Sequence, residues 1–274
     1  MYQRFLFALD LEGVNFVAGE PYLPFGETPD YEVAVREAAT EINAAAEALF
    51  SAGAAKIDVW DNHAGGGNIK KEMLDSSVTL LKVDPALPRM SFAKDKYDCI
   101  CYFGYHTMEG TLGGVLAHTM NGFEHQFYKI NGKYVGEVDL DSGIAAEHNM
   151  PSVFYVGGDL SCKQASASVP GIVTVVTKEE LSRNKANFRN NDELLAEIKE
   201  KICLAAETKL TPKKLTFPLM FEKSFKRVET AAEFMENCLS LGLDADFLSD
   251  EVMGKDGHTV VINVKNIDEF LKVI

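Results

Sequence analysis

Two acidic side chains stand at the end of the first apolar run of the sequence. Asp10 and Glu12 directly follow residues 5–9, which are typical of a buried strand. Residues two apart on an extended strand point to the same side, so both carboxylates face one way. Neighbouring carboxylates at the edge of a buried segment repel each other, and a cation is the usual compensation. The pair therefore favours a cation site, and the alternative is a solvated strand end.

Histidines follow the next two predicted strands in the same way. His63 comes after the strand predicted at 55–60, and His106 comes after the strand predicted at 97–103. Ligands of α/β proteins gather outside the carboxyl ends of the strands. Imidazole and carboxylate groups together suit zinc, with manganese or iron as alternatives. One histidine after a strand is commonplace, but two of them with an acid pair predict a metal site.

Glu137 and His118 are further candidates whose types suit the same chemistry. Glu137 falls in the second strand of a hairpin predicted around Asn131-Gly132, where it is either a fifth ligand or an exposed strand glutamate. His118 follows the glycine-rich residues 110–114. It is either an acid/base or oxyanion-stabilising group, or a hydrogen-bonded core histidine.

Several other polar residues lie close to these candidates in the sequence. Asp61 is a candidate for orienting His63, and Asn68 and Tyr105 are candidates for contacting a substrate. We interpret the triple glycine at 65–67 as a loop near the metal site, because it does not match a phosphate-binding loop. The remaining histidines are interpreted as structural: His125, His148 and His258.

The order of predicted elements indicates the fold. Strands are predicted at residues 5–9, 55–60, 97–103, 152–156 and 173–176, and helices at 31–51, 70–74, 142–149, 163–168 and 192–209. A hairpin is predicted with strands at 124–130 and 134–140. Alternation of strands and helices predicts an α/β fold with a mixed, mostly parallel sheet flanked by helices.

The pattern of predicted elements changes after Thr211-Pro212. Shorter elements follow it, with strands predicted at 215–221 and 259–263 and helices at 230–238 and from residue 267. We therefore expect an α/β metal-binding catalytic domain at 1–211 and a smaller α+β C-terminal subdomain at 212–274.

Composition narrows the classes of partner. The 274 residues carry a formal net charge of -14, which disfavours nucleic-acid and anionic membrane surfaces. The five cysteines form no CxxC pair, and no apolar stretch approaches the length of a membrane span. These features, and the lack of an export signal, lead us to expect a cytoplasmic protein. Neither a GxSxG nor an HExxH motif occurs, which argues against a serine hydrolase and a zincin.

Five short segments together resemble the DppA-type, dipeptide-operon D-aminopeptidase family of zinc metallopeptidases. They are Asp10-Leu-Glu-Gly13, Asp61-Asn-His63, Gly104-Tyr-His106, Gly114-Val-Leu-Ala-His-Thr-Met120 and Val135-Gly-Glu137. Their order and spacing match the family, and they span roughly residues 5 to 160. Each segment alone is weak, but the set is specific.

The resemblance implies roles for the matched residues. Asp10 would bridge two zinc ions, Glu12 and His106 would complete the ligands of one ion, and His63 and Glu137 those of the other. His118 would be the catalytic residue beside the metals. The family also implies a homo-oligomer, in the form of a ring with enclosed active sites.

The function expected from these residues is metal-assisted hydrolysis of an amide bond. A two-zinc aminopeptidase would remove N-terminal residues, including D-amino acids, from short peptides or amino-acid amides by metal-activated water. One alternative keeps the two metals but takes a non-peptide substrate, as an amidohydrolase or a phosphoesterase. The other alternative is a metal-binding protein without turnover.

Overall fold

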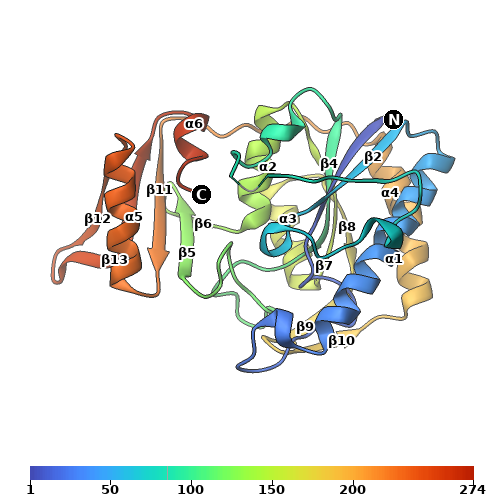
Figure 1. The fold of residues 1–274 in the computed structure, drawn as a ribbon, viewed down its shortest axis with the longest axis horizontal. Helices are drawn as coiled ribbons and strands as arrows, with labels where there is room; N and C mark the ends of the chain where they lie inside the picture. Colours follow the sequence, from blue (N-terminus) through green and yellow to red (C-terminus); the bar gives the residue numbers. More distant parts are fainter. Residues whose placement is uncertain (85) are drawn as a thin grey trace.

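The computed structural model describes residues 1–84 and 86–274, which form two large sheets, a two-stranded sheet and the helices that cover them (Figure 1). The larger sheet has the strand order β3-β2-β1-β4-β7-β8, and every neighbouring pair in it is parallel. Its strands are β1 (Arg4–Leu9), β2 (Lys56–Asp61), β3 (Thr79–Leu80), β4 (Cys99–Tyr105), β7 (Ser152–Gly157) and β8 (Val173–Val176). The predicted α/β fold with a mostly parallel sheet is confirmed.

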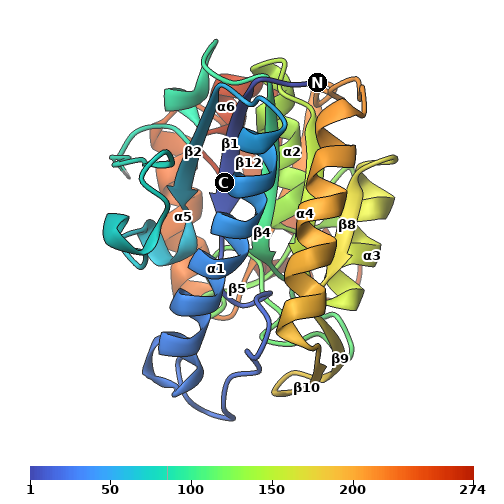
Figure 2. The ribbon, with the colours of Figure 1, turned by 90° about the vertical axis from the view of Figure 1, so that its right-hand side faces the viewer.

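Helices cover both faces of this sheet, and side chains of β1 alternate between two cores. Helices α1 (Asp30–Ser51) and α4 (Asn191–Glu207) lie side by side on one face (Figure 2). Helices α2 (Glu137–Glu147) and α3 (Asp159–Ser168) cover the other face. The odd-numbered residues of β1 face α1 and α4, and Leu6 and Ala8 face α2. Burial on both faces explains why the strands are continuous apolar runs.

The second sheet is antiparallel and combines two distant parts of the chain. Its strand order is β12-β13-β11-β5-β6. Its strands are β5 (His125–Ile130), β6 (Lys133–Val135), β11 (Leu219–Phe225), β12 (Asp244–Asp250) and β13 (Gly254–Val264). Helices α5 (Val228–Ser240) and α6 (Ile267–Phe270) pack against it. A C-terminal unit therefore shares its sheet with residues 125–135, and the division at residue 212 stays a prediction.

The predicted hairpin is confirmed at its turn but ends earlier than expected. Strand β6 stops at Val135, and Glu137 is the first residue of α2 rather than a strand residue. The carboxylate of Asp139 accepts a hydrogen bond from the amide of Gly136 at 2.8 Å, which caps the helix. This cap starts the helix five residues before the predicted Ser142.

Other local predictions differ in smaller ways. The helix expected at 70–74 is a single 3-10 turn, Lys71–Met73, and α3 begins earlier than residue 163. A short hairpin of β9 (Lys178–Ser182) and β10 (Lys185–Phe188) was not predicted. Among the helices of the described residues, none combines the length and the apolar character needed to span a bilayer.

Candidate metal centre

The carboxyl ends of three adjacent parallel strands bring the predicted residues together. Asp10 follows the last residue of β1, His63 lies two residues after β2, and His106 follows β4 directly. The first residue of α2, Glu137, supplies a carboxylate from above this edge. Since β1 pairs with both β2 and β4, the loops after the three strands are neighbours.

Two glycines let the loops after β1 and β4 touch backbone to backbone. The amide of Gly13 donates to the carbonyl of Gly104 at 2.7 Å. A Cβ on Gly13 would lie 2.0 Å from the carbonyl oxygen of Tyr105, and a Cβ on Gly104 would lie 2.0 Å from that of Asp10. Gly104 also has a φ of 68°, which L side chains rarely adopt. This close approach is what brings the Asp10 loop against the His106 loop.

One set of donor atoms gathers around Asp10, Glu12 and His63. Nδ1 of His63 lies 2.8 Å from Oδ1 of Asp10 and 3.1 Å from Oε2 of Glu12. Both carboxylates are almost completely buried. The three donor atoms lie within 4.8 Å of one another, as ligands of a single ion must.

A second set gathers around the other oxygen of Asp10. Nε2 of His106 lies 3.4 Å from Oδ2 of Asp10 and 3.4 Å from Oε1 of Glu137. Asp10 therefore presents one oxygen to each set. These two sets pair Glu12 with His63 and Glu137 with His106. The resemblance implied Glu12 with His106, which share a third donor group with His118, and His63 with Glu137.

The buried donor atoms are those that a metal ion would satisfy. Oε2 of Glu12 and Nε2 of His106 are buried and have no hydrogen-bond partner among the described residues. The Nδ1 atom of His106 faces the carbonyl of Thr107 at 3.0 Å, so the proton belongs on Nδ1 and the lone pair on Nε2. Carboxylate and imidazole donors in this number fit zinc.

Burial and opposite charge shift the pKa values of the donors strongly. Burial opposes the change, but the nearby imidazoles of His106 and His63 hold the pKa of Asp10 well below its usual range. For His63, burial is outweighed by the charge of Glu12 and the hydrogen bond with Asp10, which raise its pKa to about 11. The pKa of His106 is raised in the same manner, chiefly by Glu137 against burial. A metal ion bound by these residues would displace imidazole protons, so its binding would weaken as the pH falls.

His118 lies beside both donor sets with one nitrogen directed toward them. Its ring stacks on that of His106, with centroids 3.9 Å apart and planes at 11°. Nδ1 contacts the carbonyl of Leu116 at 2.8 Å and so carries the proton. Nε2 lies 3.9 Å from carboxylate oxygens of both Glu12 and Glu137. The His118 ring is partly exposed to the cavity, which suits an acid/base group. Its Nε2 atom also forms a candidate donor group with Glu12 and His106, so a role as a metal ligand is the alternative.

Asp61 holds the loop after β2. It was predicted to orient the His63 ring, but its carboxylate is hydrogen-bonded to Asn68 and Ile69 instead. Its carboxylate accepts hydrogen bonds from the amide of Asn68 at 2.6 Å and from that of Ile69 at 3.1 Å. The Asn68 side chain donates to the carbonyl of His63 at 2.7 Å. Tyr105, a predicted substrate contact, is buried instead and donates its hydroxyl to Asp141 at 2.7 Å.

A cavity of about 760 Å³ opens over the donor sets. Asp10, Glu12, His63, His118 and Glu137 form its polar floor. Its walls include two aromatic side chains whose rings contact that of His63. Phe25 meets it edge-on and Tyr31 at a tilt. The volume suits a short peptide or amino-acid derivative. The three histidines interpreted as structural lie outside the donor groups found among the described residues.

Sequence reasoning missed a buried lysine that fixes the loop after β1. The ammonium of Lys178 donates to the carbonyls of Glu12 at 2.6 Å, Val14 at 2.9 Å and Val17 at 2.7 Å. The preceding Thr177 hydroxyl donates to the carbonyl of Gly13 at 2.6 Å. The sequence Lys178-Glu179-Glu180 resembles a solvated charge run, and it gave no signal of this role.

The fold and the site define a class: an α/β protein with a cluster of carboxylate and imidazole metal donors at the carboxyl edge of a parallel sheet. A sequence profile described as D-aminopeptidase matches residues 4–272, and the chain belongs to this peptidase family. The prediction of an aminopeptidase, and of its family, is confirmed.

Two individual proteins show the likeness in more detail. The D-aminopeptidase of Bacillus subtilis (strain 168) is 26% identical over 212 residues, which cover 77% of this chain and 76% of that protein. The solved structure of the Zn-dependent D-aminopeptidase DppA from Bacillus subtilis, described as a self-compartmentalizing protease, superposes with a TM-score of 0.83. It shares 22% sequence identity and covers 98% of this chain and 94% of its own. The similarity of the two folds supports the α/β assignment.

Proposed function

We propose that this chain is a two-zinc aminopeptidase that removes N-terminal residues, D-amino acids among them, from short peptides or amino-acid amides. The observation that carries the proposal is the pair of donor sets that share Asp10. Membership of the D-aminopeptidase family supports the reaction, and the zinc dependence of the structural relative supports the metal. The donor chemistry of this chain agrees with both.

In this proposal each set of residues holds one ion. Asp10, Glu12 and His63 hold the first ion, and Asp10, His106 and Glu137 hold the second. When bound, the two ions supply Lewis acidity toward the substrate carbonyl and a water molecule of lowered pKa. The protein contributes buried ligands whose positions are fixed before the metal arrives. The amide of Met120, for example, donates to Oε1 of Glu137 at 2.7 Å and fixes that carboxylate.

His118 handles the proton in this scheme. Its Nδ1 proton is committed to the carbonyl of Leu116, so Nε2 is the atom that accepts or gives a proton at the floor of the cavity. A neutral Nε2 accepts the proton of the attacking water, and the same atom delivers it to the leaving amine. Nε2 lies 3.9 Å from carboxylate oxygens of both Glu12 and Glu137, so the proton is handled beside both donor sets.

The proposal extends to assembly and compartment. We propose a ring-shaped homo-oligomer, supported by the self-compartmentalizing description of the structural relative. We propose the cytoplasm as its compartment, supported by five cysteines that all have free thiols. The acidic net charge of -14 supports a substrate that is neither a nucleic acid nor a membrane.

The test is metal content measured by mass spectrometry beside hydrolysis of D- and L-alaninamide and of dipeptides of each configuration. Wild type, Asp10→Ala and His106→Ala are compared, with His148→Ala as a control because His148 lies outside the donor groups. We expect about two zinc ions per chain and amide hydrolysis in wild type and the control. Both should fall together in the two ligand variants.

Other outcomes would separate the alternatives. Zinc bound without turnover of any peptide or amide would indicate a metal-binding protein. Faster turnover of p-nitrophenyl phosphate than of the amides would indicate a phosphoesterase. If wild type contained no transition metal and gained no activity on addition of zinc or manganese, the proposed metal site would be wrong.

A further inference from the structure

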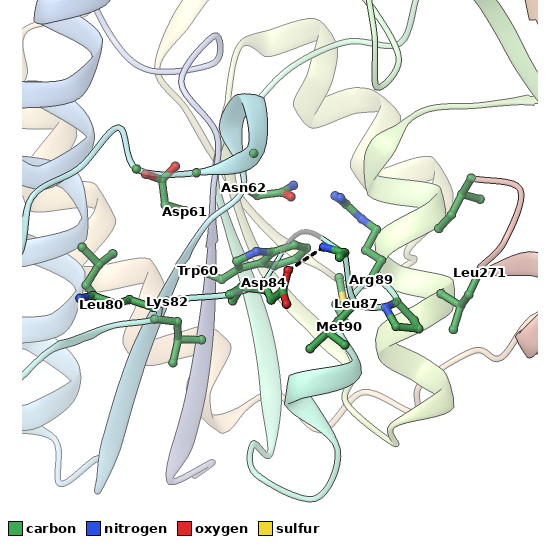
Figure 3. Close-up of a pocket in the computed structure, with 18 of the residues that line it drawn as sticks. Trp60, Asp61, Asn62, Leu80, Lys82, Asp84, Leu87, Arg89, Met90 and Leu271 are labelled. Atoms are coloured by element: carbon green, nitrogen blue, oxygen red, sulfur yellow. Dashed lines mark hydrogen bonds between the residues drawn. The ribbon is translucent and has the colours of Figure 1, made fainter.

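A second cavity, of about 1140 Å³, adjoins the cavity over the donor sets. The two cavities share the wall residues Asn62, Gly65, Arg89 and Met120. The second cavity extends from Trp60 toward the C-terminal segment near Leu271, as Figure 3 shows. Arg89 therefore lines both cavities at the place where they meet.

Arg89 lies where the two cavities meet. Its guanidinium is held in place by Asp141, and one of its nitrogen atoms has no acceptor among the described residues. Its Nε and Nη2 atoms donate to the two carboxylate oxygens of Asp141 at 2.5 and 2.8 Å. Its guanidinium stacks over the Trp60 ring at 4.8 Å. In the described part of the chain, Nη1 donates to no acceptor, and in Figure 3 the end of the side chain points toward Asn62. Arg89 thus offers one preorganised donor to the cavity.

The second cavity gathers positive charge on a chain that is acidic overall. Lys82 and Lys272 line it, are exposed, and make no ion pair within the described residues. Lys71 and Arg89 also line it, against the side-chain carboxylates of Asp61 and Asp84, and Asp141 balances the charge of Arg89. With a net charge of -14 for the chain, this local excess of cations indicates an anionic ligand.

We propose that the second cavity binds the part of the substrate on the carboxyl side of the scissile bond, and that Arg89 binds its free C-terminal carboxylate. The inference rests on the proposed aminopeptidase function and narrows its substrates to short peptides that end in a carboxylate. An amide or a long chain has no such group one or two residues beyond the cleaved bond. Charged hydrogen bonds between guanidinium and carboxylate are the strong and directional kind that this selection needs.

The experiment compares D-alanyl-glycine with D-alanyl-glycinamide, which differ only in the terminal carboxylate. Wild type should favour the dipeptide in kcat/KM by about tenfold or more, the range of one charge-assisted hydrogen bond. Arg89→Lys keeps a positive charge beside Asp141 but loses the Nη1 donor. The double variant Arg89→Met/Asp141→Asn removes both buried charges and so avoids leaving one unpaired. Both variants should lower the ratio toward one.

Lys209→Met is the matched control, because Lys209 is exposed and lines neither cavity. It should keep the wild-type ratio. Equal rates on both substrates in wild type, or a full preference in both Arg89 variants with wild-type melting temperatures, would overturn the inference while leaving the aminopeptidase function intact.

Binding to the chelator-treated protein tests the same point without turnover. Titration calorimetry should give a dissociation constant about tenfold lower for the dipeptide than for its amide. If wild type hydrolysed neither compound, the proposed function would fail, and this titration alone would decide on the carboxylate site. Equal affinities would reject it.

Discussion

Two clusters of buried charge share the segment from Glu12 to Val17, and their polar atoms are satisfied differently. On the metal side, Oε2 of Glu12 and Nε2 of His106 are buried without a hydrogen-bond partner in the described chain. On the opposite side, the Lys178 ammonium has three carbonyl acceptors at 2.6 to 2.9 Å. The first cluster leaves two metal-type donor atoms unsatisfied, whereas the Lys178 ammonium of the second has three acceptors.

The difference separates function from structure. A buried polar atom without a partner costs free energy, and two such atoms of metal-binding type at one site indicate a ligand that satisfies them. The Lys178 contacts instead fix the backbone that carries Glu12. Changes in the metal cluster should therefore act mainly on activity, and changes in the Lys178 cluster mainly on folding.

His118→Ala should give the largest effect, on activity alone. Loss of a positioned acid/base group should lower kcat for amide hydrolysis by about 10²–10⁴-fold. Because the donor sets around Asp10 remain, zinc content should stay at the wild-type level. Steady-state kinetics and metal analysis of the same samples check both statements. A fall in zinc content would show that His118 acts as a ligand, which its proximity to Glu12 and His106 permits.

Lys178→Met should act on folding. Three buried carbonyls lose their donor, and we expect the free energy of unfolding in urea to fall by about 3 kcal/mol. Lys209 is exposed and belongs to neither cluster, so Lys209→Met should leave the free energy of unfolding within about 0.5 kcal/mol of wild type. Wild-type stability of Lys178→Met, combined with lost activity, would reverse the division between the two clusters.

Glu41→Gln should change how stability depends on pH. Burial raises the pKa of Glu41 from 4.5 to about 8. Between these values the unfolded chain loses the proton first, so wild-type stability falls as the pH rises through this window. The glutamine variant lacks this contribution, and its stability relative to wild type should rise by roughly 1 kcal/mol per pH unit. Urea unfolding at pH 5, 6 and 7 measures the difference, and a constant difference would contradict it.

The metal cluster was predictable because of a general property of parallel sheets. Asp10, His63 and His106 follow the adjacent parallel strands β1, β2 and β4. Their positions just after the strands bring them to one edge of the sheet, whatever the details of the loops. Glu137 was placed in a strand, because the Asn-Gly turn predicts a hairpin but not its length. Lys178 left no pattern at all, since its burial depends on carbonyls more than 160 residues away.

The smallest predicted effect concerns the loop that supports His63. Asn68 donates to the carbonyl of His63, and its own side-chain oxygen accepts the Tyr31 hydroxyl at 2.5 Å. Asn68→Ala removes both contacts while every proposed ligand remains, so zinc affinity should fall by about tenfold.

Competition with a chromogenic chelator measures this affinity. Asn187→Ala on the β9–β10 hairpin is the control, because the Asn187 side chain donates to Glu179 at the surface and belongs to neither donor set. The loss should be confined to one of two zinc ions, because His63 belongs to only one donor set and His106 to the other. Equal weakening of both ions would show that the two sets are coupled through the shared Asp10. The metal cluster would then have to be treated as a single unit, as the Lys178 cluster is.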